Sequence, residues 1–240
     1  MDVADFRVIE ERLETAAFLD CRPVWYSSNY VFLARLQDPA GELLAIYKPR
    51  DGEAPLWDFP AGTLYRREVA AFRLANLLGW QLVPPTVVRE GPSGVGSLQV
   101  FVHHDPQQHY FVQRENPSLW PQLQRLCLFD FVANNADRKG GHCLLDESGR
   151  IWAIDNGLCF NAQYKLRTVV WDWAGEPLPD WLADELRAAV DALGREAHAA
   201  LAGLLSDLEI EAVVRRGKQL VQAGRFPVPG ETRHYPWPLV

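Results

Sequence analysis

The chain has 240 residues, of which 48% are hydrophobic and 23% charged, so it is expected to fold as one unit or two tightly joined lobes. Its formal net charge of −7 disfavours broad binding to nucleic acid, which needs basic residues to displace the counterions of phosphates. The acidic N-terminus and the lack of an apolar run of about 18 residues predict a cytoplasmic location without stable membrane insertion. The four cysteines lack the paired spacing of a zinc site and are interpreted as free thiols.

The first part of the chain is predicted to be mainly β with one embedded helix. Apolar positions at helical spacing indicate helices, and short apolar or alternating runs bounded by turn residues indicate strands. In chain order, these patterns predict a helix at residues 3–18, strands at 21–26, 30–36 and 43–47, a helix at about 64–78, and strands near 86–89 and 96–102.

The character of the sequence changes after a polar linker at residues 103–108. The patterns then predict a buried helix at about 117–133, a hairpin with strands at 143–145 and 150–154, and two or three helices within 180–223. We therefore predict an α+β fold with two lobes, a small β-rich N-lobe at residues 1–104 and a mainly α C-lobe at residues 105–240.

Two charged residues of the predicted N-lobe are candidates for a site. Lys48 ends the strand at residues 43–47, where a lysine is most often simply solvated. Glu68 falls on the apolar face of the helix at 64–78, where a carboxylate needs a partner. We predict that Glu68 pairs with Lys48, and the alternative is a local bond to a neighbour such as Arg67.

The strongest signal is a polar loop at residues 135–142, followed by the hairpin and then by Asp155-Asn156-Gly157. The hairpin returns the chain to the end at which it began, so Asp137 and Asp155 are expected to converge. Like charges so close are unfavourable without a cation, which predicts a metal site. The alternative is that each aspartate merely begins a turn, as is common for Asp-Asn-Gly.

These motifs resemble a known family. The loop that begins at Asp137 is similar to a kinase catalytic loop, and Asp155-Asn156-Gly157 resembles the metal motif shared by protein kinases, phosphatidylinositol 3-/4-kinases and bacterial HipA-like kinases. The stretch from Lys48 to Ser97 resembles small bacterial proteins of the phosphatidylinositol 3-/4-kinase-like group. The resemblance covers residues 20–185 and implies a two-lobed protein-kinase-like fold that uses ATP and Mg²⁺ or Mn²⁺.

The resemblance also implies a role for each matched residue. Lys48 is expected to contact the phosphates of ATP, held in place by Glu68. Asp137 is expected to orient the attacking hydroxyl, and Lys139 to steady the γ-phosphate. Asp155 is expected to hold the metal ion.

Two features depart from the family pattern. Ser27, Ser28 and Asn29 stand in place of a glycine-rich loop and are expected to offer hydroxyls and backbone amides to the nucleotide. His142 replaces a metal-binding asparagine, and an imidazole ligand would favour Mn²⁺ over Mg²⁺.

The segment that joins the two predicted lobes is expected to read the adenine edge through its backbone, at Gln99 and Phe101. Trp57 and Trp171 lie in loops beside the predicted cleft, and the sequence supports equally a core position and a wall for the acceptor.

We predict an ATP-dependent phosphotransferase that transfers the γ-phosphate to a hydroxyl of a small molecule or a protein. The sequence is also compatible with a protein partner. One alternative is a pseudokinase that binds nucleotide and regulates a partner without turnover, motivated by His142 and the missing glycine-rich loop. A second alternative keeps the fold and transfers AMP in place of phosphate.

Overall fold

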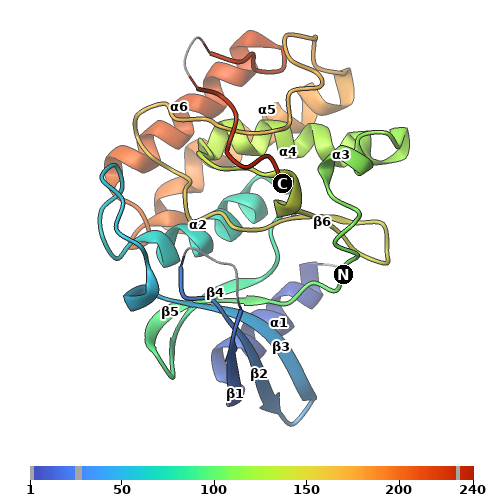
Figure 1. The fold of residues 1–240 in the computed structure, drawn as a ribbon. Helices are drawn as coiled ribbons and strands as arrows, with labels where there is room; N and C mark the ends of the chain where they lie inside the picture. The colour runs from blue at the N-terminus through green and yellow to red at the C-terminus, as the bar shows by residue number, and fades with distance from the viewer. Residues whose placement is uncertain (1–2, 25–28, 231–232) are drawn as a thin grey trace.

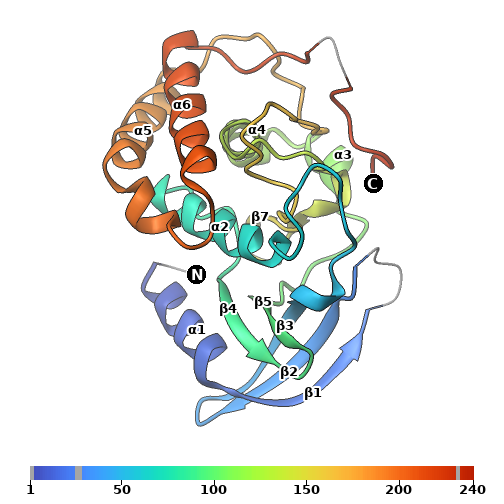
Figure 2. The ribbon, with the colours of Figure 1, turned by 90° about the vertical axis from the view of Figure 1, so that its left-hand side faces the viewer.

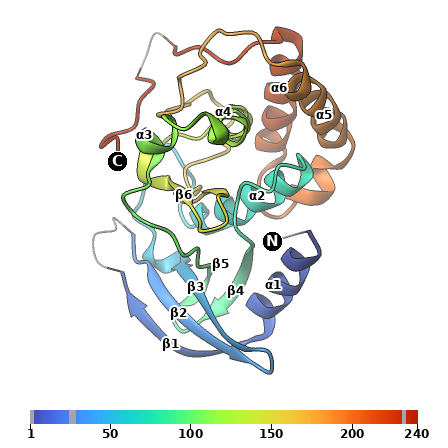
Figure 3. The same cartoon turned by 90° about the vertical axis from the view of Figure 1, so that its right-hand side faces the viewer.

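The structure is a computed structural model that describes residues 3–24, 29–230 and 233–240. A sheet-rich part formed by the N-terminal residues lies below a larger helical part in Figure 1, and the same division is visible in Figures 2 and 3. The predicted α+β fold with a β-rich first part and a mainly α second part is confirmed.

The sheet of the smaller lobe has five antiparallel strands in the order β1-β2-β3-β5-β4. The strands are β1 (Ala17–Pro23), β2 (Phe32–Asp38), β3 (Gly41–Pro49), β4 (Thr86–Gly91) and β5 (Gly94–Val100). Helix α1 (Val3–Thr15) lies beside this sheet, and its Leu13 joins Leu36, Tyr47 and Leu98 in a separate apolar core. The pairing of β3 with β5 places Lys48 opposite Ser97 at the end of the sheet nearest the helical lobe.

The predicted boundaries differ from the structure at the first helix and strand. The helix expected at residues 3–18 ends at Thr15, because Ala17 and Phe18 pair with Gln37 and Leu36 of β2. The first strand therefore begins four residues earlier than predicted, and its expected last residues, 25 and 26, lie outside the described part of the chain.

The helical lobe is built around the largely buried helix α4 (Trp120–Ala133). Its elements are α2 (Leu64–Leu77), α3 (Tyr110–Gln113), α4, the hairpin β6 (Cys143–Leu145) and β7 (Ile151–Ala153), α5 (Asp180–Leu201) and α6 (Asp207–Ala223). Helix α3 was not predicted, because a helix of four residues is too short to show a helical period.

Helix α2 lies between the sheet and the other helices of the helical lobe (Figures 1 and 2). Its apolar residues, including Phe72 and Leu74, belong to the same core as Leu126 and Phe129 of α4. A helix from the range predicted for the N-lobe thus packs in the core of the helical lobe, and the division at residue 104 stays a prediction.

Two expectations from composition concern thiols and membranes. Cys21, Cys127, Cys143 and Cys159 are free, as predicted, and the last three are buried. Among the helices of the described residues, none combines the length and apolar character needed to cross a membrane.

The close approach of β3 and β5 depends on Gly96. A Cβ atom at residue 96 would lie 2.4 Å from the carbonyl oxygen of Lys48, which is backbone and cannot move aside without displacing β3. We expect Gly96→Ala to lower the free energy of unfolding by about 1–3 kcal/mol, measured by urea denaturation. Gly194→Ala in α5 is the control, since no atom lies within 4 Å of its added Cβ, and it should raise stability by about 0.5–1 kcal/mol. A tolerated Gly96→Ala would contradict this packing.

Candidate active site

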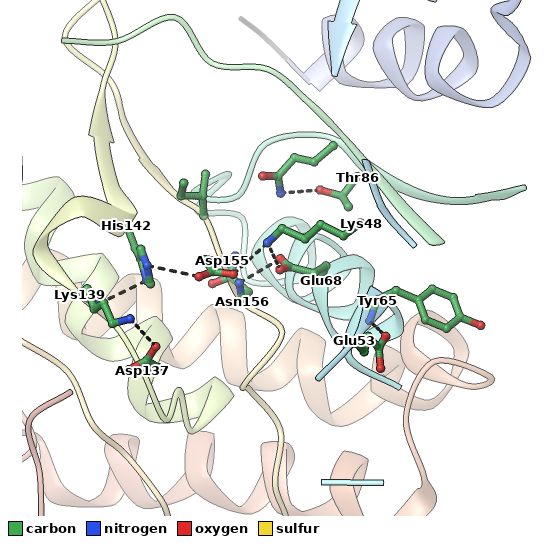
Figure 4. Close-up of polar contacts among 12 residues, drawn as sticks. Lys48, Glu53, Tyr65, Glu68, Thr86, Asp137, Lys139, His142, Asp155 and Asn156 are labelled. Carbon is green, nitrogen blue, oxygen red and sulfur yellow. Dashed lines mark hydrogen bonds and ion pairs between the residues drawn. The ribbon is translucent and has the colours of Figure 1, made fainter. Parts of the chain in front are cut away.

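Lys48 lies between two carboxylates that come from different elements (Figure 4). Its ammonium group donates a hydrogen bond to Glu68 of α2 and another, of 2.9 Å, to Oδ1 of Asp155, which follows β7. The predicted contact between Lys48 and Glu68 is confirmed. Strand β3, helix α2 and the hairpin therefore meet at one cluster of charge.

The charges of this cluster support one another. Burial alone would lower the pKa of Lys48, but the carboxylates of Asp155 and Glu68 raise it above its ordinary value. The ammonium group of Lys48 in turn holds the pKa of Asp155 well below the usual range, against the opposing effect of burial. Both groups are ionised at neutral pH, so Asp155 carries the negative charge that a metal ligand needs.

Glu68 also fixes the backbone around Asp155. Its Oε2 accepts a hydrogen bond of 2.9 Å from the N–H group of Asn156, and its side chain is 4% exposed. Asp155 has a φ of 56°, a left-handed conformation that is costly for a residue other than glycine. Such a conformation persists only where surrounding contacts hold it, and Glu68 supplies one of them.

A fully buried ion pair lies behind these residues. Arg138, next to Asp137 in the loop, contacts Asp130 of α4 at 3.0 Å, and both side chains are 0% exposed. Arg138 also donates hydrogen bonds of 2.7 Å to the carbonyl oxygen of Ile154 and to Oδ1 of Asn156. The pKa of Arg138 is raised above its ordinary value, because Asp130 outweighs the opposing effect of burial.

Asp130 also accepts hydrogen bonds from the loop and from the segment that follows Asp155-Asn156-Gly157. Its Oδ1 accepts from the amide group of Asn135 at 3.3 Å, and its Oδ2 accepts from the hydroxyl of Thr168 at 3.1 Å. Neither Asp130 nor Arg138 was predicted as a site residue. The signal was nevertheless present, because Asp130 interrupts the apolar run of the helix predicted at 117–133 just as Glu68 interrupts the apolar face of its own helix.

Asp137 is presented by the turn that ends α4. Asn134 adopts a left-handed conformation with a φ of 54° and terminates the helix. Asn135 then accepts a hydrogen bond of 2.9 Å from the N–H group of Asp137. The carboxylate of Asp137 lies 3.1 Å from Nζ of Lys139. Burial raises the pKa of Asp137, and Lys139 only partly offsets this effect, so this carboxylate is a better proton acceptor than an exposed one.

His142 lies against Asp155. Its Nε2 is 3.3 Å from Oδ2 of Asp155, and its Nδ1 accepts from the N–H group of Lys139 at 3.5 Å. Burial lowers the pKa of His142 to about 4, although Asp155 opposes the shift, so the ring is neutral at pH 7. These contacts assign the hydrogen to Nε2. Ligation of a metal through Nε2 requires the other tautomer, so this role of His142 and the expected preference for Mn²⁺ stay predictions.

A cavity of about 200 Å³ opens at this cluster. Six predicted site residues line it: Asn29, Lys48, Glu68, Asp137, Lys139 and Asp155. Tyr30, Leu56, Tyr65 and Leu158 contribute to its wall. Asn29 also accepts a hydrogen bond of 2.7 Å from the N–H group of Ala54, which ties the end of the β1–β2 connection to the loop after β3.

Two other predicted residues, Gln99 and Phe101, do not line this cavity. Gln99 donates a hydrogen bond of 2.8 Å to the hydroxyl of Thr86, and the N–H group of Phe101 donates to the carbonyl of Leu44 at 2.9 Å. Neither residue lines the cavity, and the N–H group of Phe101 is engaged within the sheet, so the reading of adenine at this segment stays a prediction. Ser27 and Ser28 lie outside the described residues.

The side chains present fit a divalent metal. The described residues contain no group of three or more His, Cys, Asp and Glu side chains that could hold an ion alone. Mg²⁺, however, is usually bound by one or two carboxylates together with phosphate oxygens and water. Ionised Asp155, close enough to Asp137 to raise its pKa, matches that requirement.

Comparison with known proteins places the sequence in a family. The sequence pattern described as Phosphatidylinositol 3- and 4-kinase matches residues 85–205, half of the 240-residue chain. The chain belongs to this family. The matched range contains Asp130, Asp137, Arg138 and Asp155, so the catalytic-loop and metal-motif resemblance falls within it.

Two relatives differ in how much of their length they share. Protein Rv2133c of Mycobacterium tuberculosis is 37% identical over 245 residues, and the match covers 88% of each chain. Phosphatidylinositol 4-kinase gamma 4 of Oryza sativa is 29% identical over 175 residues, which are 57% of this chain and 30% of that protein. The likeness to the plant enzyme is therefore limited to a part of it.

Solved structures show the protein-kinase-like fold. Hydra Fam20, solved with a sugar, has a TM-score of 0.61 and 15% identity, and the match covers 92% of this chain and 88% of that one. The Golgi casein kinase with Mn/ADP bound has a TM-score of 0.52 and 14% identity, covering 93% and 76%. The predicted two-lobed protein-kinase-like fold is confirmed.

The buried pair of Arg138 and Asp130 gives a stability prediction. Arg138→Met leaves Asp130 buried without its counter-ion, so the free energy of unfolding should fall by about 3–5 kcal/mol. Arg187→Met is the matched control, because Arg187 and its partner Asp184 are 58% and 70% exposed, and such pairs contribute about 0–1 kcal/mol. The double variant Arg138→Met/Asp130→Leu should be more stable than Arg138→Met alone. Equal losses for Arg138→Met and Arg187→Met in urea denaturation would refute this view.

His142 predicts a loss of stability in mild acid. Its pKa is lowered in the folded state, so the unfolded chain binds the proton more readily and acidification through the unfolded pKa of 6.5 destabilises the fold. Between about pH 7.5 and about pH 5, the wild type should lose about 2 kcal/mol more than His142→Asn. His198→Asn, which replaces a histidine that is 63% exposed, should keep the wild-type slope. Parallel slopes for wild type and His142→Asn would disprove the buried neutral imidazole.

Proposed function

We propose that this protein is an ATP-dependent phosphotransferase that moves the γ-phosphate of ATP to a hydroxyl acceptor with a divalent metal. The observation that carries the proposal is the three-way contact of Lys48 with Glu68 and Asp155 in the lining of a cavity that Asp137 also lines. Family membership supports phosphotransfer, and the similar fold of the Golgi casein kinase, solved with Mn/ADP bound, supports a nucleotide and a divalent cation as cofactors.

Each side chain has a defined part in this proposal. Lys48 binds the non-transferred phosphates as a fixed cation, and Glu68 prevents it from turning away. Asp155, with His142 in its other tautomer, would hold a divalent metal, which would neutralise charge on the phosphates when bound. Lys139 lies 3.1 Å from Asp137 and places a second cation on the side where the transferred group moves.

The transfer itself involves Asp137. The bond between the γ-phosphorus and the β,γ-bridging oxygen breaks, a new bond forms to the acceptor oxygen, and ADP leaves. The acceptor hydroxyl donates its hydrogen bond to Asp137, which takes up the proton as the new bond forms. The raised pKa of Asp137 favours this step, because a carboxylate whose pKa lies closer to the working pH accepts a proton more readily.

A second candidate function is nucleotide binding without turnover. It is favoured by His142, whose imidazole occupies one oxygen of Asp155 and offers no oxygen donor to a second metal ion. ATP labelled at the γ-phosphate or at the α-phosphate, supplied with Mg²⁺ or Mn²⁺, separates the possibilities. Transfer of the γ-label indicates a kinase and transfer of the α-label indicates AMP transfer. Binding of ATP with no transfer of either label to any acceptor indicates a pseudokinase.

The two aspartates should respond differently to replacement. Asp155→Asn keeps a residue that tolerates the left-handed backbone but removes the charge, so ATP affinity in the presence of metal should fall by about tenfold or more. Asp137→Asn should leave ATP affinity within about twofold and lower kcat by roughly 100-fold or more, because its hydrogen bond to the acceptor matters most in the transition state.

The measurements are the shift of melting temperature with ATP and metal, and the rate of γ-label transfer. Asp184→Asn is the control, because Asp184 is 70% exposed on α5 and should change neither quantity. Equal losses of ATP affinity at Asp155 and Asp137 would reject the division of roles. No thermal shift with ATP and either metal would reject the proposed function.

A further inference from the structure

Residues 233–240, called the tail segment below, lie across the loop that presents Asp137. The N–H group of Gly140 donates a hydrogen bond of 2.7 Å to the carbonyl oxygen of Leu239. The N–H group of Thr168 donates to the carbonyl oxygen of His234 at 3.1 Å, and the indole N–H of Trp171 donates to the same oxygen at 3.3 Å. The segment ends beside α3 and the hairpin in Figures 1 and 2.

The surface beneath the tail segment is joined to the buried ion pair by hydrogen bonds. Arg138 and Thr168 form a parallel bridge, with the N–H group of Val169 donating to the carbonyl of Arg138 at 3.1 Å. The hydroxyl of Thr168 bonds to Asp130, so the surface is anchored to the buried ion pair. Gly140 fits closely, because a Cβ there would lie 3.1 Å from Phe111 and 3.3 Å from the carbonyl oxygen of Leu239.

The contacts are those of polypeptide recognition. The carbonyl oxygens of His234 and Leu239 accept hydrogen bonds from the surface, and two of the three donors are main-chain N–H groups. Such bonds do not depend on which side chains the bound chain carries. Side chains add two features, the ring of His234 against Trp171 with centroids 6.2 Å apart, and the buried Pro236. An extended chain of another protein can make the same main-chain bonds.

The tail segment lies near the loop that carries Asp137. Arg233 lies close enough to Asp137 for its charge to oppose the raised pKa of that carboxylate. A hydroxyl that receives a phosphoryl group must approach Asp137 from outside the cavity. A polypeptide acceptor that reached Asp137 along Gly140 and Thr168 would lie where the tail segment lies.

We propose that the surface formed by Gly140, Thr168 and Trp171 binds an extended polypeptide acceptor, and that residues 233–240 occupy it in cis and compete with that acceptor. This inference rests on the proposed function and names its acceptor class as a protein. The tail segment is suited to release, because Trp237, Leu239 and Val240 are 77%, 39% and 56% exposed and thus bury little apolar area against the lobe.

The first test measures the surface without ATP. A chain shortened after Phe226 keeps that residue, which is 3% exposed and packs against Trp173, and exposes the surface. A synthetic peptide of residues 227–240 should bind the shortened chain one to one in isothermal calorimetry. Its affinity for the full chain should be lower by at least about tenfold, because the attached tail competes at a high effective concentration. Equal affinity for both chains, or no binding to the shortened chain, would overturn the proposal.

The second test keeps the full chain and uses a matched pair of variants. Pro236→Asp places a charge at a buried position and should release the tail segment, whereas Trp237→Asp places the same charge at a neighbour that is 77% exposed. The acceptor is a degenerate peptide library in which each peptide carries one Ser, Thr or Tyr. Pro236→Asp and the shortened chain should transfer the γ-label to the library at least about fivefold faster than the wild type. Trp237→Asp should stay within about twofold of the wild type.

The outcomes separate this inference from the proposed function. If the variants bind ATP but transfer label no faster than the wild type, or more slowly, the tail segment does not compete with a peptide acceptor and the inference fails. If no form of the protein binds ATP, the proposed function fails, and the calorimetric measurement alone decides whether the surface binds a polypeptide.

Discussion

The buried ion pair of Arg138 and Asp130 is the interaction on which the rest of the site depends. Through it the end of α4, the loop that carries Asp137, the backbone before Asp155 and the segment at Thr168 are held to one another. A buried pair of this kind adds little net stability relative to apolar residues of the same volume, but the loss of one partner is costly. Its effect is therefore to impose one arrangement on four segments, since any other arrangement leaves a charge buried without a partner.

The arrangement gives two neighbouring carboxylates opposite character. Lys48 lowers the pKa of Asp155, whereas burial raises the pKa of Asp137. Pairs of titratable groups whose surroundings move their pKa values apart commonly divide acid–base and electrostatic tasks. In the proposed function, this division assigns metal and phosphate binding to the ionised Asp155 and proton acceptance to Asp137. Glu68 ties the Lys48–Asp155 side of the site to the position of α2, because it contacts both Lys48 and the N–H group of Asn156.

The proposed acceptor side of the site is built differently from the proposed cofactor side. Side-chain charges line the cavity proposed for the cofactor, whereas main-chain N–H groups of Gly140 and Thr168 define the surface under the tail segment. Both sides meet at the loop that Arg138 and Asp130 hold in place. A change in the tail segment can therefore alter access to Asp137 without altering the contacts of Lys48, which is why ATP affinity and acceptor transfer are expected to respond separately.

The sequence by itself determined the order of the strands and of the longer helices, the pairing of Lys48 with Glu68 and the convergence of Asp137 with Asp155. These features follow from local periodicity and from the cost of a lone carboxylate on an apolar helix face, both of which are visible in one dimension. Only the tertiary structure decided the partner of Asp130, the direction of the His142 ring and the position of residues 233–240. The bond from the N–H group of Phe101 to the carbonyl of Leu44 was likewise visible only there, and the reading of adenine at Gln99 and Phe101 stays a prediction. Each of these contacts depends on how the loops and elements pack in space, and a spacing pattern carries no information about which group will meet a buried charge or an unpaired main-chain donor.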